Sequence, residues 1–380
     1  MKILLVGEYS RLHNTLKEGL NTLGHEVTLL GDGDGFKNFP VDISIKPVFV
    51  KLPAVKWLTV LLYKTLNIDL TELERGLRFF QHLKHLKNYD VVQLINEKPI
   101  KTIPFIERYL LKRLFHQNSK TFLLSCGIDL ISLEFMLEKG FRYSLMDPFQ
   151  ENPDLKAEYK YIQDYKSKSH RKTHNLVFEN INGVIATDFD YVLPLLNHKQ
   201  FLGLVPNPIN TDRINFKPLA IDKTTVIFLG INKGTYYKKG IPFFEKALKI
   251  IEDTYLDKVK IIRVESIPYK QYLKLYEEAH IILDQVYAYD QGYNALEAMA
   301  AGKVVFTGAE KEFLEHYKIP EDEVVINALP EVDSIVEKLS WLIETPEKIE
   351  QIGKNARAFI EKEHQYQKVA KKYLKVYSTE

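Results

Sequence analysis

Short apolar runs alternate with helical periodicity along the first two hundred residues. Residues 3–6 and 27–30 are apolar runs typical of buried strands, and between them leucines recur at three- to four-residue spacing from Leu12 to Leu23. This spacing predicts an amphipathic helix, which Gly24 ends. The order strand, helix, strand predicts a βαβ unit and therefore a parallel sheet. Further strands are predicted at residues 90–95, 121–125 and 182–186.

The pattern restarts after a proline-containing joint at residues 204–210. Its sequence, Leu-Val-Pro-Asn-Pro-Ile-Asn, holds two prolines that the interior of a strand or helix would not accept. Beyond it, strands are predicted at residues 225–229, 259–264, 281–283 and 304–306, with a helix at residues 243–251. Two such series predict an α/β protein of two Rossmann-like, doubly wound domains. We assign residues 1–203 to the first domain, 204–362 to the second and 363–380 to a final helix.

Composition narrows the class of protein. A chain of 380 residues exceeds the usual size of a single core, which agrees with two domains. The 52 basic and 50 acidic residues leave a net charge of +2, so a dedicated nucleic-acid binder is not expected. The single cysteine, Cys126, excludes a disulfide framework and fits a reducing cytosol. The apolar run at the beginning is too short for a signal peptide, and no window suits a membrane span, so we expect a cytoplasmic protein.

The most informative segment is residues 292–303, Gly-Tyr-Asn-Ala-Leu-Glu-Ala-Met-Ala-Ala-Gly-Lys. Its small residues predict a helix packed closely on a sheet, with Gly302 as its end. We place Glu297 in the first turn, where a carboxylate gains from the helix dipole and is able to accept hydrogen bonds from ligand hydroxyls. The backbone N–H groups of Gly292, Tyr293 and Asn294 would suit phosphate or sugar oxygens. The alternative is a helix that merely packs on a parallel strand.

This segment resembles the donor-site signature of the retaining glycosyltransferases of the GT-B fold, family 4 in particular. The family pattern is Glu-Gly-Phe-Gly-x-x-x-Leu-Glu-Ala-Met-Ala-x-Gly. The matching positions are Gly292, Leu296, Glu297, Ala298, Met299, Ala300 and Gly302. Tyr289 stands where the family has its first glutamate, with Asp290 beside it. The resemblance implies two domains facing across a cleft, with the last helix crossing back to the first domain.

Transfer of a sugar from a nucleotide donor requires positive charge near the leaving diphosphate. Residues 228–240 place three lysines in a loop after a predicted strand, and Lys239 with Gly240 matches the Lys-Gly pair that binds the diphosphate in the family. Lys233 or Asn232 holds the place of the family's arginine. The alternative is a solvated basic loop. The resemblance implies catalytic roles for Lys239, Glu297 and Lys233. The implied donor-binding residues are Gly230, Asn232, Gly240, Asp290, Gly292, Tyr293 and Asn294.

Two loops of the first domain are candidates for the acceptor side. The loop at residues 7–13 lacks Gly-x-Gly-x-x-Gly, which weakens a dinucleotide-binding interpretation. The same loop faces the cleft in related enzymes. It contributes the candidates Gly7, Glu8, Ser10 and His13, although His13 fits an exposed position equally well. In residues 125–129, Gly127 and Asp129 match the family's His-Gly-x-Asp, whereas Cys126 stands in place of the histidine.

No metal site or cofactor is expected. Asp32-Gly-Asp34 and Asp188-Phe-Asp190 have a spacing that holds a divalent cation in other glycosyltransferase folds. Both pairs lie in the first domain, which we expect to place them away from the donor loops. The turn composition around Asp32 also explains that pair without a ligand.

The resulting prediction is a retaining, metal-independent glycosyltransferase that uses a UDP- or GDP-sugar and a glycan or lipid-linked acceptor, in cell-surface polysaccharide synthesis. The alternatives are a partner subunit that binds nucleotide sugar without turnover, which Tyr289 and Cys126 favour, and a nucleotide-sugar epimerase. Residues 50–66 mix Trp57 and leucines with lysines, a composition that suits weak peripheral contact with the inner face of a membrane. Its alternative is a helix that covers one face of the sheet.

Overall fold

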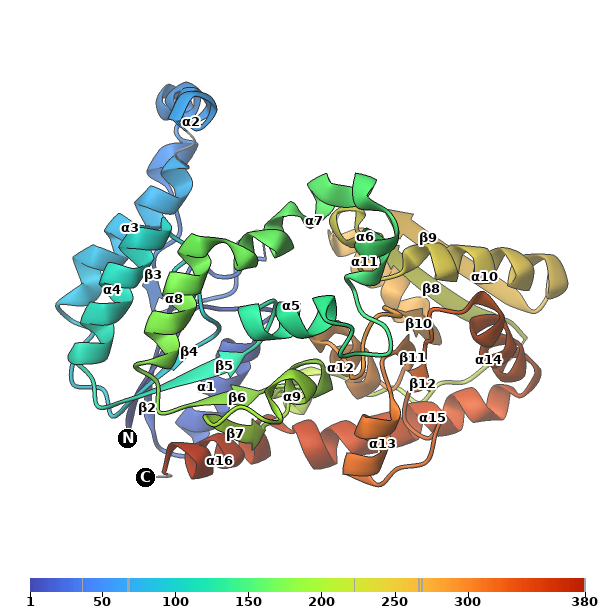
Figure 1. Cartoon of the computed structure of the whole chain (residues 1–380). Helices are drawn as coiled ribbons and strands as arrows, with labels where there is room; N and C mark the ends of the chain where they lie inside the picture. Colours follow the sequence, from blue (N-terminus) through green and yellow to red (C-terminus); the bar gives the residue numbers. More distant parts are fainter. Residues whose placement is uncertain (36, 67–68, 222, 266, 268, 379–380) are drawn as a thin grey trace.

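The protein contains two parallel sheets, each covered by helices on both faces (Figure 1). The computed structural model describes residues 1–35, 37–66, 69–221, 223–265, 267 and 269–378. The strands of the first sheet all precede those of the second along the chain, and each sheet with the helices that cover it forms one domain. We refer to them as the first and second domains.

The first sheet has seven parallel strands in the order β3-β2-β1-β4-β5-β6-β7. These strands are β1 (Lys2–Val6), β2 (Glu26–Gly31), β3 (Ile43–Ser44), β4 (Val91–Leu94), β5 (Lys120–Ser125), β6 (Gly183–Ala186) and β7 (Phe201–Leu204). The helices of this half are α1 (Leu12–Thr22), α2 (Pro53–Leu66), α3 (Leu70–Leu83), α4 (Pro104–His116), α5 (Leu130–Leu137), α6 (Asp147–Glu151), α7 (Lys156–Gln163), α8 (Lys168–Phe178) and α9 (Phe189–Leu195).

Alternate residues of each strand pack on opposite faces of this sheet, because successive side chains of a strand point in opposite directions. Ile3 and Leu5 pack with Leu16 of α1, whereas Leu4 and Val6 belong to the apolar cluster that includes residues of α3, α4 and α8. All of these side chains are fully buried. Both faces are covered, as parallel sheets require.

The second sheet has five parallel strands in the order β12-β11-β10-β8-β9. They are β8 (Thr225–Ile231), β9 (Val259–Glu265), β10 (Ile281–Leu283), β11 (Val304–Thr307) and β12 (Ile326–Asn327). The helices are α10 (Ile241–Thr254), α11 (Tyr269–Glu278), α12 (Tyr293–Ala300), α13 (Lys311–Tyr317), α14 (Val332–Glu344) and α15 (Pro346–Phe359). The strand predicted at residues 281–283 has these bounds in the structure, and Asp284 begins the loop that leads to α12.

The chain crosses between the domains a second time after α15. A π-helical segment, Ile360–His364, leads to α16 (Tyr366–Tyr377), which packs on α1 of the first domain. The two crossings are hydrogen bonded to each other, because Ile209 N–H donates to the His364 carbonyl and Tyr366 N–H donates to the Ile209 carbonyl. The last helix therefore completes the first domain.

A long excursion of the first domain lies on the second domain. After α5 the chain passes through residues 138–146, α6 and α7 before α8 returns it to the first sheet, and its residue Arg142 contacts Tyr289 of the second domain. Lys238 of the second domain donates to the carbonyl of Glu158 in α7 at 3.0 Å. We call residues 138–167 the bridging segment. The sequence pattern did not predict it.

Gly19 sets how closely α16 approaches α1. A Cβ atom at this position would lie 2.5 Å from the carbonyl oxygen of Tyr366, which is part of the backbone and has little freedom to move. We predict that Gly19→Val lowers the free energy of unfolding by about 1–3 kcal/mol, as overpacking does. Asn21→Val places the same side chain at an exposed position of α1 and is the control. Denaturant unfolding of both variants checks this, and equal midpoints would contradict it.

Candidate active site

Two loops of the second domain meet at the carboxyl edge of its sheet, where such sheets bind ligands. One follows β8 and contains Lys239; the other follows β10 and contains Asp284. The strands are neighbours, and Val286 N–H donates to the Lys239 carbonyl at 3.1 Å. The Lys239 ammonium is 2.7 Å from Asp284 Oδ1, which fixes its direction. Gly240 has φ +66°, and a Cβ there would lie 2.0 Å from Val286, so the position requires glycine.

Glu297 lies on α12 facing the first domain. Burial raises the pKa of its carboxyl, while Arg11 and Lys37, both from the first domain, lower it. The expectation that Glu297 stands in the first turn is wrong, because α12 begins at Tyr293 and Glu297 is its fifth residue. The helix dipole acts mainly within the first turn, so it contributes little here. The charges of the first domain are the electrostatic partners of Glu297.

Three other predicted donor residues surround the beginning of α12. Gly292 is its N-cap residue and lines a cavity described below, and Asn294 is exposed. The Tyr293 hydroxyl donates to the Pro208 carbonyl at 2.6 Å and to Thr15 Oγ1 at 2.8 Å. Tyr293 therefore joins α12 to the first domain and to the interdomain joint.

The other residues predicted after β8 lie nearer the surface. The ammonium of Lys233 is 2.7 Å from Glu265 Oε1, and its side chain is 76% exposed. Asn232 accepts a hydrogen bond from Gly234 N–H, which closes a local turn, and Gly230 is half-buried within β8. Lys239 has the more enclosed position of the two lysines.

Tyr289, which replaces the family's first glutamate, holds the bridging segment. Its hydroxyl accepts a hydrogen bond from Arg142 N–H at 2.6 Å, and the Arg142 guanidinium lies 4.6 Å from the ring centroid. Arg142 also pairs with Glu312 at 2.7 Å and with Glu310, and Glu310 accepts from Tyr143. Tyr289 is 2% exposed. Its side chain is thus part of the contact between the domains.

Three aspartates, Asp188, Asp190 and Asp290, lie at the same contact between the domains, which we call the seam. Asp190 of the first domain accepts from Tyr289 N–H at 3.1 Å, and Asp290 of the second accepts from Phe189 N–H at 3.3 Å. Burial raises the pKa of Asp290 to about 8 and raises the pKa of Asp190 as well. The expectation that Asp188 and Asp190 lie away from the donor loops is wrong, because the carboxyl edge of β6 faces the second domain. The other pair lies within the first domain, where Asp32 contacts Arg75 and Lys101.

The loop after β1 is held by the first helix. Glu8 is fully buried and accepts from the backbone N–H groups of His13 and Asn14, and burial raises its pKa to about 7. His13 is also fully buried, with Nδ1 2.8 Å from the Gly7 carbonyl, so the exposed alternative is wrong. Burial lowers the pKa of His13 to about 4 and keeps the ring neutral at neutral pH. Gly7 adopts φ +88°, and Ser10 the strained value of +49°.

The loop after β5 also has local structural roles. Asp129 caps α5, accepting from Ser132 N–H at 2.7 Å, and it accepts from the Ser125 hydroxyl as well. Gly127 has φ +75°. Burial raises the pKa of the Cys126 thiol above its ordinary range, which disfavours the reactive thiolate.

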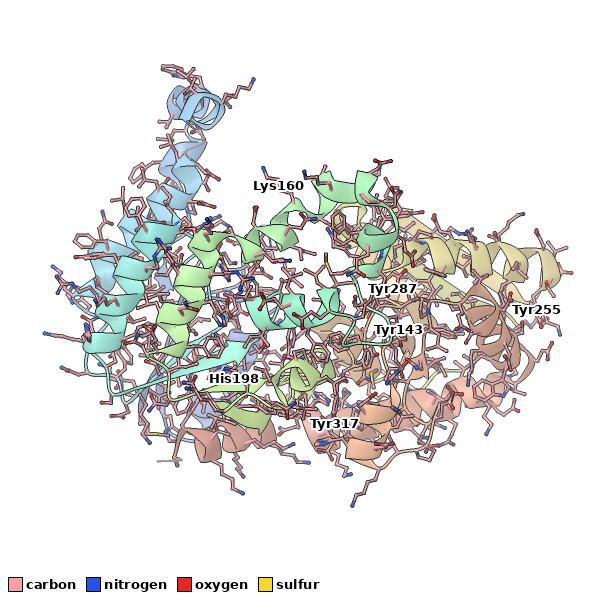
Figure 2. The ribbon with its side chains drawn as sticks, in the orientation of Figure 1. Tyr143, Lys160, His198, Tyr255, Tyr287 and Tyr317 are labelled. Atoms are coloured by element: carbon pink, nitrogen blue, oxygen red, sulfur yellow. The ribbon has the colours of Figure 1, made fainter. Side chains whose placement is uncertain are left out.

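A cavity of about 240 Å³ lies where the domains meet, next to these loops. Residues of the first domain that line it come from the loop after β5, from α5, from the bridging segment and from the beginning of α9; residues of the second domain come from both donor loops. Figure 2 labels two of them, Tyr143 and Tyr287, at this junction. Lys238, Gln285 and Asp188 also line the cavity, and none of them was predicted to bind the sugar or nucleotide. For Asp188, its position directly after the predicted strand at residues 182–186 could have indicated such a role.

No group of three or more His, Cys, Asp or Glu side chains in the described ranges is arranged to hold a metal ion. In the same part of the chain, no helix is long and apolar enough to cross a membrane.

The fold is GT-B: two Rossmann-like domains facing each other, with a terminal helix that returns to the first domain. Residues 239–375 match the family model described as glycosyl transferase-like, which begins at Lys239 and covers the part of the second domain that follows β8 and most of α16. The chain therefore carries a glycosyltransferase-like region on a GT-B fold. A sequence search of curated proteins returns no significant match.

Solved structures agree on this fold. A sucrose-phosphate synthase from Thermosynechococcus elongatus is 16% identical, with a TM-score of 0.61 over 99% of this chain and 98% of that one. HepE of Anabaena, in complex with UDP and glucose, is 13% identical, with a TM-score of 0.61 over the whole of both chains. A Listeria monocytogenes protein described as a putative UDP-N-acetylglucosamine 2-epimerase is 10% identical, with a TM-score of 0.52 over 98% and 94%.

The Asp290 carboxyl predicts a dependence of stability on pH. Its pKa is raised to about 8, so between about pH 4 and pH 8 the folded protein retains a proton that the unfolded chain has lost. This group therefore lowers the free energy of unfolding as pH rises, by at most about 1.4 kcal/mol per unit, and the effect ends near pH 8. Asp290→Asn removes the charge and keeps the shape.

We predict that the Tm of Asp290→Asn minus that of the wild type increases from pH 5 to pH 8.5 in thermal unfolding. Asp257→Asn, at an exposed position of the second domain, removes the same charge and should show a constant difference. If the Tm of Asp290→Asn and that of the wild type changed equally with pH, the raised pKa of the buried Asp290 carboxyl would be refuted.

Proposed function

We propose that the protein is a retaining glycosyltransferase of family 4 that transfers a sugar from a UDP- or GDP-sugar to a glycan or lipid-linked acceptor in polysaccharide synthesis. The observation that carries the proposal is that the loop of Lys239 is hydrogen bonded to the loop that leads into α12, and α12 carries Glu297 close to Arg11 and Lys37 of the first domain. Residues 204–362 would bind the nucleotide sugar and residues 1–203 the acceptor. The match to a glycosyl transferase-like family model supports the reaction class.

The chemistry follows from the charges at this edge. As the bond between sugar and diphosphate breaks, negative charge grows on the leaving group, and a positioned cation stabilises it. Lys239, oriented by Asp284, supplies that cation in this proposal. The Glu297 carboxylate accepts hydrogen bonds from ribose hydroxyls. Residues of both domains around the cavity exclude water from the reacting centre.

We predict that Lys239→Ala and Glu297→Ala each lower the transfer rate by about 10²–10³, since loss of one contact to a developing charge in a water-excluded site costs about 2.7–4 kcal/mol. Lys249→Ala, an exposed lysine of α10, is the matched control and should retain full activity. The measurement is steady-state transfer from UDP- and GDP-sugars, with thermal shifts to show that each variant folds. If both site variants kept the wild-type turnover, the catalytic roles of Lys239 and Glu297 would be excluded.

An epimerase is the second candidate, because one of the similar structures carries that description. The same assay separates the two: an epimerase isomerises the nucleotide sugar without an acceptor, whereas a transferase releases the nucleotide only as the sugar moves to an acceptor or to water. A partner subunit without activity would bind the nucleotide sugar and do neither.

Peripheral contact with a membrane is a further part of the proposal. Of the sixteen large apolar side chains that are exposed in the described ranges, ten lie between residues 48 and 109. Trp57 on α2 is 64% exposed, and Figure 1 shows α2 projecting from the first domain. Residues 46–116 hold thirteen Lys and Arg against six Asp and Glu. An apolar surface with excess positive charge supports contact with anionic lipid headgroups.

We predict that the protein sediments with phosphatidylglycerol-containing vesicles at low salt and is released at high salt. Trp57→Glu should weaken this binding severalfold, because a charged side chain replaces an apolar one at the projecting helix. Leu256→Glu makes the same kind of change at a 78% exposed position of the second domain and should have no effect. If the two variants bound vesicles equally, or if the wild type did not bind them, the surface around Trp57 would be excluded as a membrane-contact surface.

A further inference from the structure

The cavity between the domains has the size and lining of a subsite for one sugar ring. Its volume of about 240 Å³ is below the about 300–1,000 Å³ of pockets that enclose a whole drug-sized ligand. Tyr143 and Tyr287 line it, and aromatic rings pack well on the C–H groups of a sugar. Ser132, Gln285 and Asp188 line it as well and carry polar groups able to bond to sugar hydroxyls.

Most of the carboxylate oxygens at the seam are already occupied. Asp290 accepts from Phe189 N–H through one oxygen and from Gln291 N–H through the other. Asp190 accepts from Tyr289 N–H. These two aspartates are therefore used in joining the domains.

Asp188 differs from both of them. It lines the cavity, and its Oδ2 accepts from the Thr187 hydroxyl at 3.0 Å. Its Oδ1 is buried and has no hydrogen-bond partner within the described residues. A buried carboxylate oxygen without a donor is unfavourable, and most such atoms in proteins are paired. Burial and the neighbouring Asp190 and Asp290 raise the pKa of Asp188, whereas the Thr187 hydroxyl and the backbone N–H of Asp190 lower it. A hydroxyl group that entered the cavity would supply the missing donor.

We propose that Asp188 recognises the hydroxyl groups of the transferred sugar, and that this subsite takes a neutral sugar in preference to one that carries a carboxylate. The inference rests on the proposed function and names the residue that selects the sugar. A sugar carboxylate would have to lose its water beside Asp188 and Asp190, two carboxyl groups whose own ionisation burial already disfavours. Lys238, the cation on the opposite wall, is already bonded to the Glu158 carbonyl and lies over the ring of Tyr159.

The experiment is calorimetric titration of the whole protein with UDP, UDP-glucose, UDP-glucuronate, GDP and GDP-mannose. Asp188→Asn keeps the shape of the side chain and replaces one acceptor oxygen by an NH2 donor. We expect this variant to bind UDP or GDP as the wild type does and to bind the matching nucleotide sugar about fivefold more weakly or worse, the loss typical when one partner of a buried hydrogen bond is removed. The wild type should bind UDP-glucose more tightly than UDP-glucuronate, and the variant should narrow that difference. Asp257→Asn is the matched control.

The outcomes separate this inference from the proposed function. If Asp188→Asn binds nucleotide and nucleotide sugar as the wild type does, the role of Asp188 is excluded and the proposed function stands. If the wild type binds none of the five ligands, the proposed function fails and the subsite with it. If Asp188→Asn loses nucleotide and nucleotide sugar alike, Gln285→Ala on the opposite wall decides: selective loss of the sugar supports the subsite, and its absence overturns it.

Discussion

The relative position of the two domains depends on the contact between Arg142 and the loop that precedes α12. The backbone of Arg142 donates to the Tyr289 hydroxyl, and its guanidinium lies over the Tyr289 ring and pairs with Glu310 and Glu312. Two domains linked only by two crossings would be free to rotate about them. Here the bridging segment adds a third connection, and it also supplies a wall of the interdomain cavity. The geometry of the site therefore depends in part on a contact between this donor loop and the bridging segment.

Tyr289 shows how a different residue at one position of a motif changes what that position contacts. In the resembling family a glutamate at this position contacts the donor. Here the tyrosine side chain faces the bridging segment, and Asp290 beside it is used within the seam. The carboxyl groups that line the cavity, those of Asp188 and Asp190, come from the first domain.

Local patterns predicted most of the fold. The leucine spacing of residues 12–23 and the apolar runs of the strands are patterns of only a few residues. The sequence therefore predicted α1, β1 and β8. Lys239 with Gly240 was also recognisable, since its motif is contiguous. The bridging segment was not, because its contacts join positions about 150 residues apart. The burial of His13 and the approach of Asp188 to the donor loops likewise depend on packing between distant elements, which no short window of sequence contains.

The return of α16 to the first domain has a consequence for how the chain folds during synthesis. Val369, Tyr373 and Tyr377 belong to the apolar cluster beneath the first sheet, and the Tyr377 hydroxyl is bonded to the buried Gln93. These residues leave the ribosome only after the entire second domain. Until then, the part of this sheet face that α16 covers, around Phe122 beside Tyr377, remains exposed, although its strands have long been made. The domain that is synthesised first is consequently the one that is finished last, and its exposed apolar face must be kept from aggregation in the interval.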